Sequence, residues 1–358
     1  MHKYHTLTVA SVVSETSDSL RIALNVPENL REVFVFKSGQ HLPIQLSIDG
    51  KLVRRTYSIS SVPGETPLIF GIRVQPGGKF SEFLQSNLKI GDHLEAMPPV
   101  GRFHAVPDPQ KAKVRIAFAA GSGITPILSI MRTMLENEPE SRFVLFYGNR
   151  MQSTTMFIED LQALKNRFPG RLQLYFLFSQ EDQELEIFSG RLDKLKVTQL
   201  YKAFCKKMIP DEVYICGPGT MLNGVKQALV SENVDESLFL IERYGALVNR
   251  KTQQLIPKAP ANKKGSLVEV IMDGHKKSFE MAADGPDNLV DAAAVEGIVL
   301  PFSCRGGVCA TCRTYVRSGE ARMATNHGLE PWEVEKGFVL ACQARPVSSK
   351  LTIDYDET

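Results

Sequence analysis

Short runs in which apolar and polar residues alternate dominate the chain up to about residue 105. Turn-forming pairs and triplets such as Pro63-Gly64 and Pro76-Gly77-Gly78 separate these runs. Regularly spaced short strands of this kind are typical of an antiparallel barrel. The runs are Thr6–Val13, Ser19–Val26, His41–Ile48, Val53–Ser60, Leu68–Val74 and Asp92–Ala96. We therefore predict an antiparallel β-barrel domain over residues 1–107.

The pattern then changes to continuous apolar runs that alternate with segments of helical periodicity. Apolar residues at helical spacing follow the first run, between Ile127 and Leu135, and form one face. Such an alternation indicates buried parallel strands joined by helices. The predicted strands are Val114–Ala120, Phe143–Tyr147, Leu172–Phe178, Val213–Cys216 and Leu238–Ile241, and the further helices lie near Met156–Phe168, Leu192–Phe204 and Thr220–Ser231. We predict a doubly wound α/β domain over residues 108–245.

A polar, basic and proline-bearing stretch at residues 246–264 is typical of a linker. Beyond it, Ser266–Met272 and Lys276–Glu280 flank Asp273-Gly274, a strong hairpin signal. A short helix near residues 288–296 and a late strand at Leu351–Asp354 complete the pattern. The sequence predicts a small α+β domain over residues 265–358.

Four cysteines in this last domain, Cys304, Cys309, Cys312 and Cys342, have the spacing Cys-x4-Cys-x2-Cys, then 29 residues, then Cys. This is the plant-type ferredoxin spacing for a 2Fe–2S cluster. A zinc site or two disulfides are the alternatives, but zinc sites more often use two Cys-x2-Cys pairs and one is present here. We predict that the four cysteines bind the cluster in a β-grasp ferredoxin fold.

Composition narrows the class of protein. The chain has 358 residues, a net charge of +2 and six cysteines, of which Cys205 and Cys216 have no obvious pairing. Neither a charge bias for nucleic acid or a membrane surface nor an apolar spanning stretch is present in the sequence. No basic segment followed by an apolar core opens the sequence. We expect a cytoplasmic enzyme that binds neither nucleic acid nor a membrane.

Two segments of the barrel domain have the chemistry of a flavin site. In the segment Arg54–Ser58, a guanidinium suits the phosphates, an aromatic ring suits the flavin ring system, and Ser58 suits the reactive N5. A second segment with two glycines leads into a helical run whose free amides suit a pyrophosphate. Either segment alone is compatible with an ordinary strand or turn, but the ordered pair favours FAD over FMN. The candidate residues are Arg55, Thr56, Tyr57 and Ser58, with Gly77, Gly78, Lys79, Phe80 and Ser81.

Two glycine-bearing segments of the α/β domain suit a nicotinamide dinucleotide. Gly121–Pro126 directly follows a buried strand and opens a helix, so its amides and the helix dipole face a pyrophosphate. Later, Cys216-Gly217-Pro218 ends another strand, and ligands of such sheets bind at the carboxyl ends of strands. Cys216 is therefore predicted to lie beside the nicotinamide, although a small buried residue before a turn is the simpler alternative.

Together these motifs resemble a ferredoxin–NADP reductase module fused to a plant-type ferredoxin, as in the reductase components of oxygenases. The resemblance covers essentially the whole chain, in the same domain order. It implies that the barrel residues hold FAD, that Gly121, Gly123, Thr125 and Pro126 bind the NAD(P) pyrophosphate, and that Ser58 and Cys216 are catalytic. It also matches Glu242-Arg243-Tyr244 to the end of the reductase module, where an aromatic residue often lies near the flavin.

The adenosine end departs from the family pattern, because NADPH-specific members often carry Ser-Arg where this chain has Ser179-Gln180. Arg150 and Arg191 are candidates to supply the missing charge, so we expect NADPH, with NADH as an alternative. Electrons are expected to pass from NADPH to FAD, then to the cluster, and then to a diiron oxygenase. A reductase for a ring- or steroid-hydroxylating oxygenase, or a redox sensor without turnover, are the competing hypotheses.

Overall fold

The computed structural model describes residues 3–243, 264–282, 286, 288–329 and 331–357. Most of the predicted linker at 246–264 and Tyr244 lie outside these described residues. The chain divides into two compact units, one formed by residues 4–53 and 57–245 and the other mainly by residues 246–358. No helix in the described part of the chain is long and apolar enough to cross a membrane.

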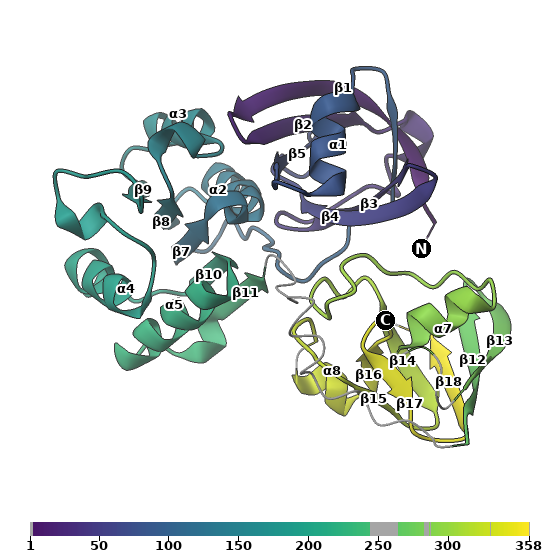
Figure 1. The fold of residues 1–358 in the computed structure, drawn as a ribbon. Coiled ribbons are helices and arrows are strands. Elements are labelled where there is room, and N and C mark those ends of the chain that lie inside the picture. Colours follow the sequence, from purple (N-terminus) through teal and green to yellow (C-terminus); the bar gives the residue numbers. More distant parts are fainter. Residues whose placement is uncertain (1–2, 244–263, 283–285, 287, 330, 358) are drawn as a thin grey trace. The chain divides into compact units, whose positions relative to one another are not determined.

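The first half of the larger unit is a six-stranded antiparallel barrel with sheet order β4-β3-β6-β1-β2-β5 (Figure 1). A bridge between Ile59 and Phe70 connects the end of β4 to β5, and the apolar side chains of the strands fill the interior. Helix α1 follows the last glycine of a turn at Gly78. The elements are β1 (His5–Thr16), β2 (Ser19–Asn25), β3 (His41–Ile48), β4 (Lys51–Ser58), β5 (Leu68–Arg73), α1 (Lys79–Asn87) and β6 (His93–Ala96). The predicted barrel is confirmed.

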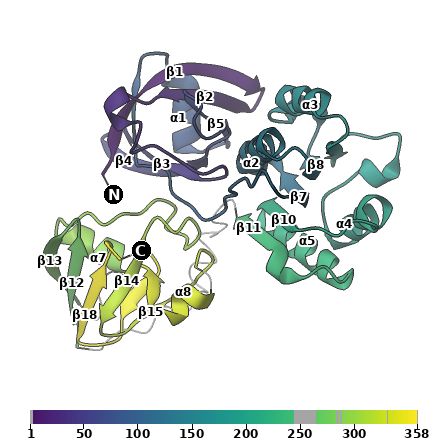
Figure 2. The same ribbon diagram turned by 180° about the vertical axis from the view of Figure 1, so that it is seen from behind.

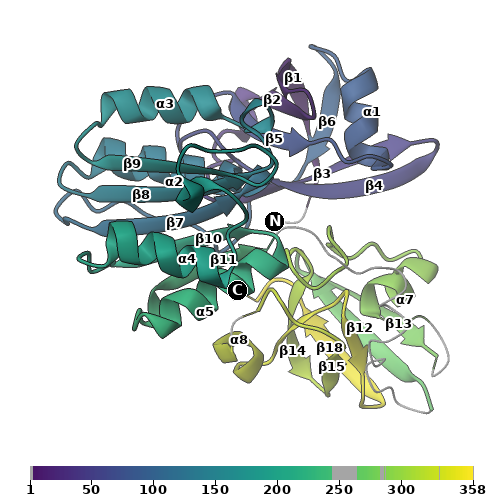
Figure 3. The same ribbon diagram turned by 60° about the vertical axis from the view of Figure 1, so that its left-hand side comes forward.

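The second half of the larger unit is a five-stranded parallel sheet with order β11-β10-β7-β8-β9. Helices α2 and α3 cover one face of the sheet and α4 and α5 cover the other, as Figure 3 shows. The strands are β7 (Val114–Ala120), β8 (Arg142–Asn149), β9 (Leu172–Phe178), β10 (Glu212–Gly217) and β11 (Phe239–Arg243). The helices are α2 (Ile124–Asn137), α3 (Ile158–Arg167), α4 (Lys194–Leu200), which continues into a π-helical turn at Tyr201–Cys205, and α5 (Gly219–Ser231). The doubly wound α/β prediction is confirmed.

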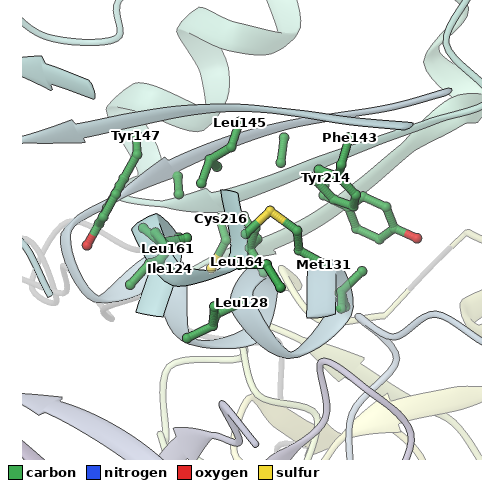
Figure 4. Close-up of a cluster of buried hydrophobic side chains, with 14 of the residues drawn as sticks. Ile124, Leu128, Met131, Phe143, Leu145, Tyr147, Leu161, Leu164, Tyr214 and Cys216 are labelled. Atoms are coloured by element: carbon green, nitrogen blue, oxygen red, sulfur yellow. The ribbon is translucent and has the colours of Figure 1, made fainter. Parts of the chain in front are cut away.

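The strand order of this sheet reverses between β7 and β10, which are neighbours in the sheet but distant in sequence. Ligands of open α/β sheets bind at the carboxyl ends of strands at such a switch point. Figure 4 shows the core beneath this point, where Ile124 and Leu128 of α2 lie opposite Leu145 and Tyr147 of β8, with Cys216 between the layers. The packed core thus fixes the ends of β7 and β10 side by side.

The smaller unit is an α+β fold built on a mixed sheet of order β13-β12-β18-β14-β16, with β15 and β17 paired beside it (Figure 2). The predicted hairpin is present: Met272 pairs with His275, and Asp273 and Gly274 have φ of 52° and 73°, as a type I′ turn requires. Helix α7 begins after Asn288, whose side chain accepts from the N–H of Asp291. The elements are β12 (Ser266–Met272), β13 (His275–Met281), α7 (Leu289–Val295), β14 (Arg313–Ser318), β15 (Ala321–Met323), α8 (Pro331–Glu335), β16 (Phe338–Leu340), β17 (Ala344–Pro346) and β18 (Lys350–Asp354).

Candidate functional site

The predicted flavin residues lie along β4. Arg55 is exposed and its Nη1 donates to the carbonyl oxygen of Arg54 at 2.7 Å. Thr56 and Tyr57 are half-buried, and the Tyr57 ring stacks on Phe70 with ring centroids 5.6 Å apart. One face of this ring is therefore supported by the barrel core, as a flat binding surface for a ring system would require. The binding roles of these residues stay predictions.

The second predicted flavin segment forms a tight turn that starts α1. Gly77 has φ of 74°, and Gly78 is the N-cap residue. The Ser81 hydroxyl donates to the carbonyl oxygen of Gly78 at 3.2 Å and accepts a backbone N–H at 3.1 Å. Lys79 is exposed, whereas Phe80 is 1 % exposed and anchors the turn in the core. Ser81 therefore holds the turn in shape, and the remaining free amides at the helix start suit a pyrophosphate.

The predicted nucleotide loop lies at the switch point. Gly121 has φ of 54°, a conformation that favours glycine, and α2 begins directly after Gly123. A Cβ atom on Gly123 would overlap the carbonyl oxygen of Cys216 and lie 2.7 Å from its carbonyl carbon. The Thr125 hydroxyl donates to a loop carbonyl at 2.9 Å, and Pro126 occupies the first turn of the helix. The structure thus brings Gly121, Gly123 and Cys216 together.

Two side chains that the sequence did not single out support this loop. The buried Tyr147 hydroxyl donates to the carbonyl oxygen of Gly121 at 2.9 Å, and burial raises the pKa of this phenol. Arg73 of β5 places its Nη2 4.0 Å from where a Cβ of Gly121 would lie, while the same atom donates to the carbonyl oxygen of Thr154 at 3.0 Å. A guanidinium therefore stands beside the predicted pyrophosphate loop. No local sequence pattern marks it, because Arg73 belongs to a different domain.

Ser58 and Cys216, the predicted catalytic pair, meet at one carboxylate. Ser58 is 2 % exposed, and its Oγ donates to Oε2 of Glu242 at 3.2 Å. Cys216 is fully buried, and its Sγ lies 3.8 Å from the same oxygen. The other oxygen, Oε1, lies 3.5 Å from Nδ1 of His41. Two barrel strands, β3 and β4, and two strands of the α/β sheet, β10 and β11, thus build a four-residue cluster.

This cluster has the polar groups needed to bind the polar edge of a ring-shaped ligand. His41 is 5 % exposed, and its buried Nε2 has no hydrogen-bond partner among the described residues. A buried polar atom without a partner is costly unless a ligand satisfies it. Neither residue was predicted to be functional: Glu242 is part of the stretch that resembles the end of the reductase module, and His41 begins a predicted strand. Contacts over such long sequence separations leave no local pattern.

At the predicted adenosine end, the structure brings two of the three candidates, Arg150 and Ser179, into one corner of the parallel sheet. The N–H of Ser179 donates to the carbonyl oxygen of Asn149 at 3.0 Å, and that of Gln180 to Arg150 at 2.9 Å. The carboxyl ends of β8 and β9 therefore lie together. The guanidinium of Arg150, however, is paired with Asp18 at 2.5 Å. Arg191 is exposed in the segment before α4. Gly217 is buried and Pro218 exposed at the end of β10.

The four cysteines that are predicted to bind the cluster lie in the smaller unit, on a loop and beside β16. The Sγ atom of Cys304 accepts backbone N–H groups from Gly306 and Cys309, both at 3.4 Å. Cys309 Sγ accepts the N–H of Cys304 at 3.5 Å. The Cys312 and Cys342 side chains are buried in the core of this unit. A loop of N–H groups that points at sulfur is suited to thiolates.

The thiols form two pairs. The mutual hydrogen bond lowers the pKa of Cys304 to about 5 and raises that of Cys309 well above its usual value. In the same way, contact between Cys312 and Cys342 raises the pKa of the first and lowers that of the second. Four thiolates together therefore need a strongly positive partner. The two iron ions of a 2Fe–2S cluster would supply this positive charge.

Gln343 braces this loop and was not found by sequence reasoning. Its Nε2 donates to the carbonyl oxygen of Arg305 at 2.8 Å and lies 3.7 Å from Sγ of Cys342. The Thr325 hydroxyl donates to its Oε1 at 2.8 Å. Gly307 has φ of 70°, and a Cβ there would lie 2.9 Å from the Gln343 side chain. In contrast, Cys205 lies far from these groups in sequence, and burial raises its pKa to about 12, which leaves an unreactive thiol.

Three family models match the chain in succession. An oxidoreductase FAD-binding domain covers residues 5–105, an oxidoreductase NAD-binding domain covers residues 118–227, and a 2Fe-2S iron-sulfur cluster binding domain covers residues 272–347. The chain therefore has domains for all three cofactor types that the motifs predict.

Relatives and solved structures agree with this domain order. The chain is 39% identical to a subunit of 1,2-phenylacetyl-CoA epoxidase from Escherichia coli (strain K12), over 99% of both chains. It is 32% identical to the ferredoxin reductase component of 3-ketosteroid-9-alpha-monooxygenase from Rhodococcus rhodochrous, over 98% of this chain and 96% of that one. Phthalate dioxygenase reductase has the same fold, with a TM-score of 0.59, 22% identity and 98% coverage of both chains. With FAD-binding, NAD-binding and 2Fe–2S domains in this order, the chain belongs to the family of oxygenase reductase components in which a flavin reductase module is joined to a C-terminal ferredoxin domain.

Proposed function

We propose that this chain is the reductase component of a diiron oxygenase, phenylacetyl-CoA epoxidase, and delivers electrons from NADPH through FAD and the 2Fe–2S cluster. The 39% identity with the Escherichia coli epoxidase component, over 99% of both chains, is the observation that carries this proposal. The steroid monooxygenase relative, at 32% identity, supports the second candidate, a reductase for a ring- or steroid-hydroxylating oxygenase.

The proposed domains are the FAD domain at residues 1–107, the NAD(P) domain at 108–245 and the ferredoxin domain at 265–358. Within the first, Arg55, Thr56, Tyr57 and Ser58 and the segment Gly77–Ser81 would hold FAD. The loop from Gly121 to Pro126 would bind the pyrophosphate of NADPH, and Cys216 would contact the nicotinamide. Conversion of one hydride into two single electrons is chemistry that bound flavin supplies. We also assign the chain to the cytoplasm, where thiols that bind iron stay reduced.

The residues of the chain have definable tasks in this scheme. The backbones of Gly123 and Cys216 lie in contact. The position of a nucleotide bound at the loop is therefore linked to the position of the end of β10. A hydride carries a proton as well as two electrons, and an iron–sulfur cluster accepts electrons alone. Ser58 donates to Glu242, whose other carboxylate oxygen faces His41. These three side chains would move the proton away from the buried end of β4.

Replacement of one cluster ligand tests the order of the electron path. In Cys309→Ser we expect NADPH-dependent reduction of ferricyanide, an acceptor for flavin electrons, to persist, while reduction of cytochrome c is lost. Cys205→Ala is the matched control, since this buried cysteine lies outside the cluster and both activities should persist. Survival of both activities with an intact cluster spectrum in Cys309→Ser would contradict the ligand assignment.

A component exchange tests the identity of the acceptor. Purified reductase, NADPH and the oxygenase subunits of phenylacetyl-CoA epoxidase should turn over phenylacetyl-CoA, whereas a steroid or ring-hydroxylating oxygenase in their place should give little product. Turnover with the second group alone would favour the second candidate. Absence of flavin or cluster absorbance, or of any acceptor reduction, would exclude the enzyme, and a cluster spectrum without acceptor reduction would favour a redox sensor or carrier.

A further inference from the structure

The carboxylate of Asp18 is held between two arginines that belong to different halves of the larger unit. Asp18 lies in the turn between β1 and β2, where the Thr16 hydroxyl donates to its Oδ1 at 2.9 Å. Oδ1 is also paired with Nη1 of Arg73, and Oδ2 is paired with Nη2 of Arg150 at 2.5 Å. The turn thus fixes the carboxylate, and each of its oxygens engages a separate guanidinium.

These two arginines point to the two ends of the predicted nucleotide site. Arg73 stands beside Gly121 of the pyrophosphate loop. Arg150 leaves the carboxyl end of β8, where its carbonyl oxygen accepts the N–H of Gln180 after β9. Ligands of such sheets bind along these strand ends. Asp18 therefore stands between the pyrophosphate position and the corner assigned to the adenosine.

The ion pair between Arg150 and Asp18 is accessible to a ligand. The side chain of Arg150 is 55% exposed and that of Asp18 26%, whereas that of Arg73 is 12% exposed. Exposed ion pairs contribute little free energy, so the pair with Arg150 opens easily. Guanidinium groups bind phosphate as well as carboxylate, in the same forked geometry. A 2′-phosphate, present in NADPH and absent in NADH, would have to compete with Asp18 for Arg150.

We propose that Asp18 is a specificity-determining residue, which weakens discrimination between NADPH and NADH by keeping Arg150 from the 2′-phosphate. The proposal rests on the proposed function, because it assumes that the corner at β8 and β9 takes the adenosine end of a nicotinamide dinucleotide. Arg191, the other predicted source of positive charge for this phosphate, is exposed. The chain would then prefer NADPH only modestly.

Calorimetric titration of the oxidised holoenzyme with 2′,5′-ADP and with 5′-AMP isolates the effect of the 2′-phosphate without turnover. Asp18→Asn keeps the side-chain shape and its bond from Thr16 but removes the charge. We expect this variant to bind 2′,5′-ADP roughly fivefold more tightly than the wild type, which is the change in affinity that one exposed ion pair is worth. The affinity for 5′-AMP should change less than about twofold. Adding Arg150→Gln to Asp18→Asn should remove the gain, while Arg150→Gln alone should change little.

Glu65→Gln is the matched control, because Glu65 forms a similar exposed pair with Arg132 across the same two domains, with Nη2 and Oε1 2.8 Å apart. This control should change neither affinity. An Asp18→Asn variant with unchanged or weaker 2′,5′-ADP binding, or a gain that survives Arg150→Gln, would overturn the proposal while leaving the proposed function intact. Failure of the wild type to bind both NADP⁺ and NAD⁺ would overturn the proposed function and this inference together.

Discussion

The backbone of Gly123 lies against the backbone of Cys216, so closely that a Cβ atom on the glycine would lie 2.7 Å from the cysteine carbonyl carbon. The contact joins the predicted pyrophosphate loop to the strand end that is predicted to meet the nicotinamide. Gly123 itself has φ of −61°, which any residue adopts, so space rather than backbone conformation requires glycine here. The loop has no room to carry a side chain at this position.

We therefore predict that Gly123→Ala weakens nucleotide binding. Relief of the overlap requires the loop to move away from β10, and such overpacking typically costs about 1–3 kcal/mol, equivalent to roughly 5- to 150-fold in affinity. The dissociation constant of NADP⁺, measured by titration of the flavin absorbance, checks this. Gly170→Ala is the control, because a Cβ at Gly170 meets no atom within 4 Å. Equal affinities in the two variants would contradict the role of the contact.

Glu242 gives a second prediction, since its carboxylate contacts both predicted catalytic side chains. In Glu242→Gln the amide oxygen still accepts from Ser58, but the proton-accepting charge beside His41 is lost. We expect reoxidation of the NADPH-reduced flavin by ferricyanide, the step that releases the proton, to slow by about 100-fold in stopped-flow absorbance, the lower end for general acid–base groups, with little change in flavin reduction by NADPH or in nucleotide affinity. Glu232→Gln is the control, because Glu232 pairs with Lys202 after α5. An unchanged rate would exclude a proton-transfer role.

Features encoded within a few residues were predictable from sequence. The strand Val114–Ala120 is followed by glycines and a periodic helix, so the loop and its position could be read directly, and the strand bounds are confirmed. The Asp273-Gly274 turn was equally readable, because both residues must adopt positive φ. Local chemistry and backbone conformation leave a local pattern.

Partners brought together by the tertiary fold were not predictable. Ser58 and Glu242 are separated by 184 positions, and Arg150 and Asp18 by 132. The sequence offered Arg150 as a charge for phosphate, but it contains no sign that a turn in the barrel domain would hold the guanidinium. Arg73 was missed for the same reason. A single arginine at a strand end has no distinguishing sequence pattern, and its place beside Gly121 depends on how the neighbouring domain packs.

Gln343 provides a prediction for the cluster. Its amide lies 3.7 Å from Sγ of Cys342, and hydrogen bonds to cluster sulfurs raise the reduction potential. At this long distance we expect Gln343→Met to lower the potential by at most about 40 mV, the one-electron equivalent of about 1 kcal/mol. Redox titration followed by electron paramagnetic resonance checks this, with Ser318→Ala at the edge of β14 as control. A rise in potential, or loss of the cluster, would contradict this tuning role.

The buried ion pair between Arg115 and Glu138 supports the opposite end of the α/β sheet. These side chains are 1% and 0% exposed, with Nη1 and Oε2 2.6 Å apart. Arg115 keeps a second ion pair, from its Nε to Oε2 of Glu212 at 2.7 Å, so Glu138→Gln removes only one of its two charged partners and should destabilise the chain by about 1.5–3 kcal/mol. Urea unfolding followed by release of flavin fluorescence measures this loss. Glu136→Gln is the matched control, because Glu136 pairs with the 61% exposed Arg167 and should cost less than about 1 kcal/mol.

The same pair sets a pH dependence. Burial tends to raise the pKa of Glu138, but hydrogen bonds from Arg115 and Ser141 outweigh this and lower it below its ordinary value of 4.5. A carboxylate whose pKa is lower in the folded state stabilises the fold above the unfolded value, and this contribution is lost as pH falls through the folded value. As pH falls below about 5, the free energy of unfolding should therefore fall more steeply in the wild type than in Glu138→Gln. Parallel profiles would show that Glu138 does not titrate with unfolding.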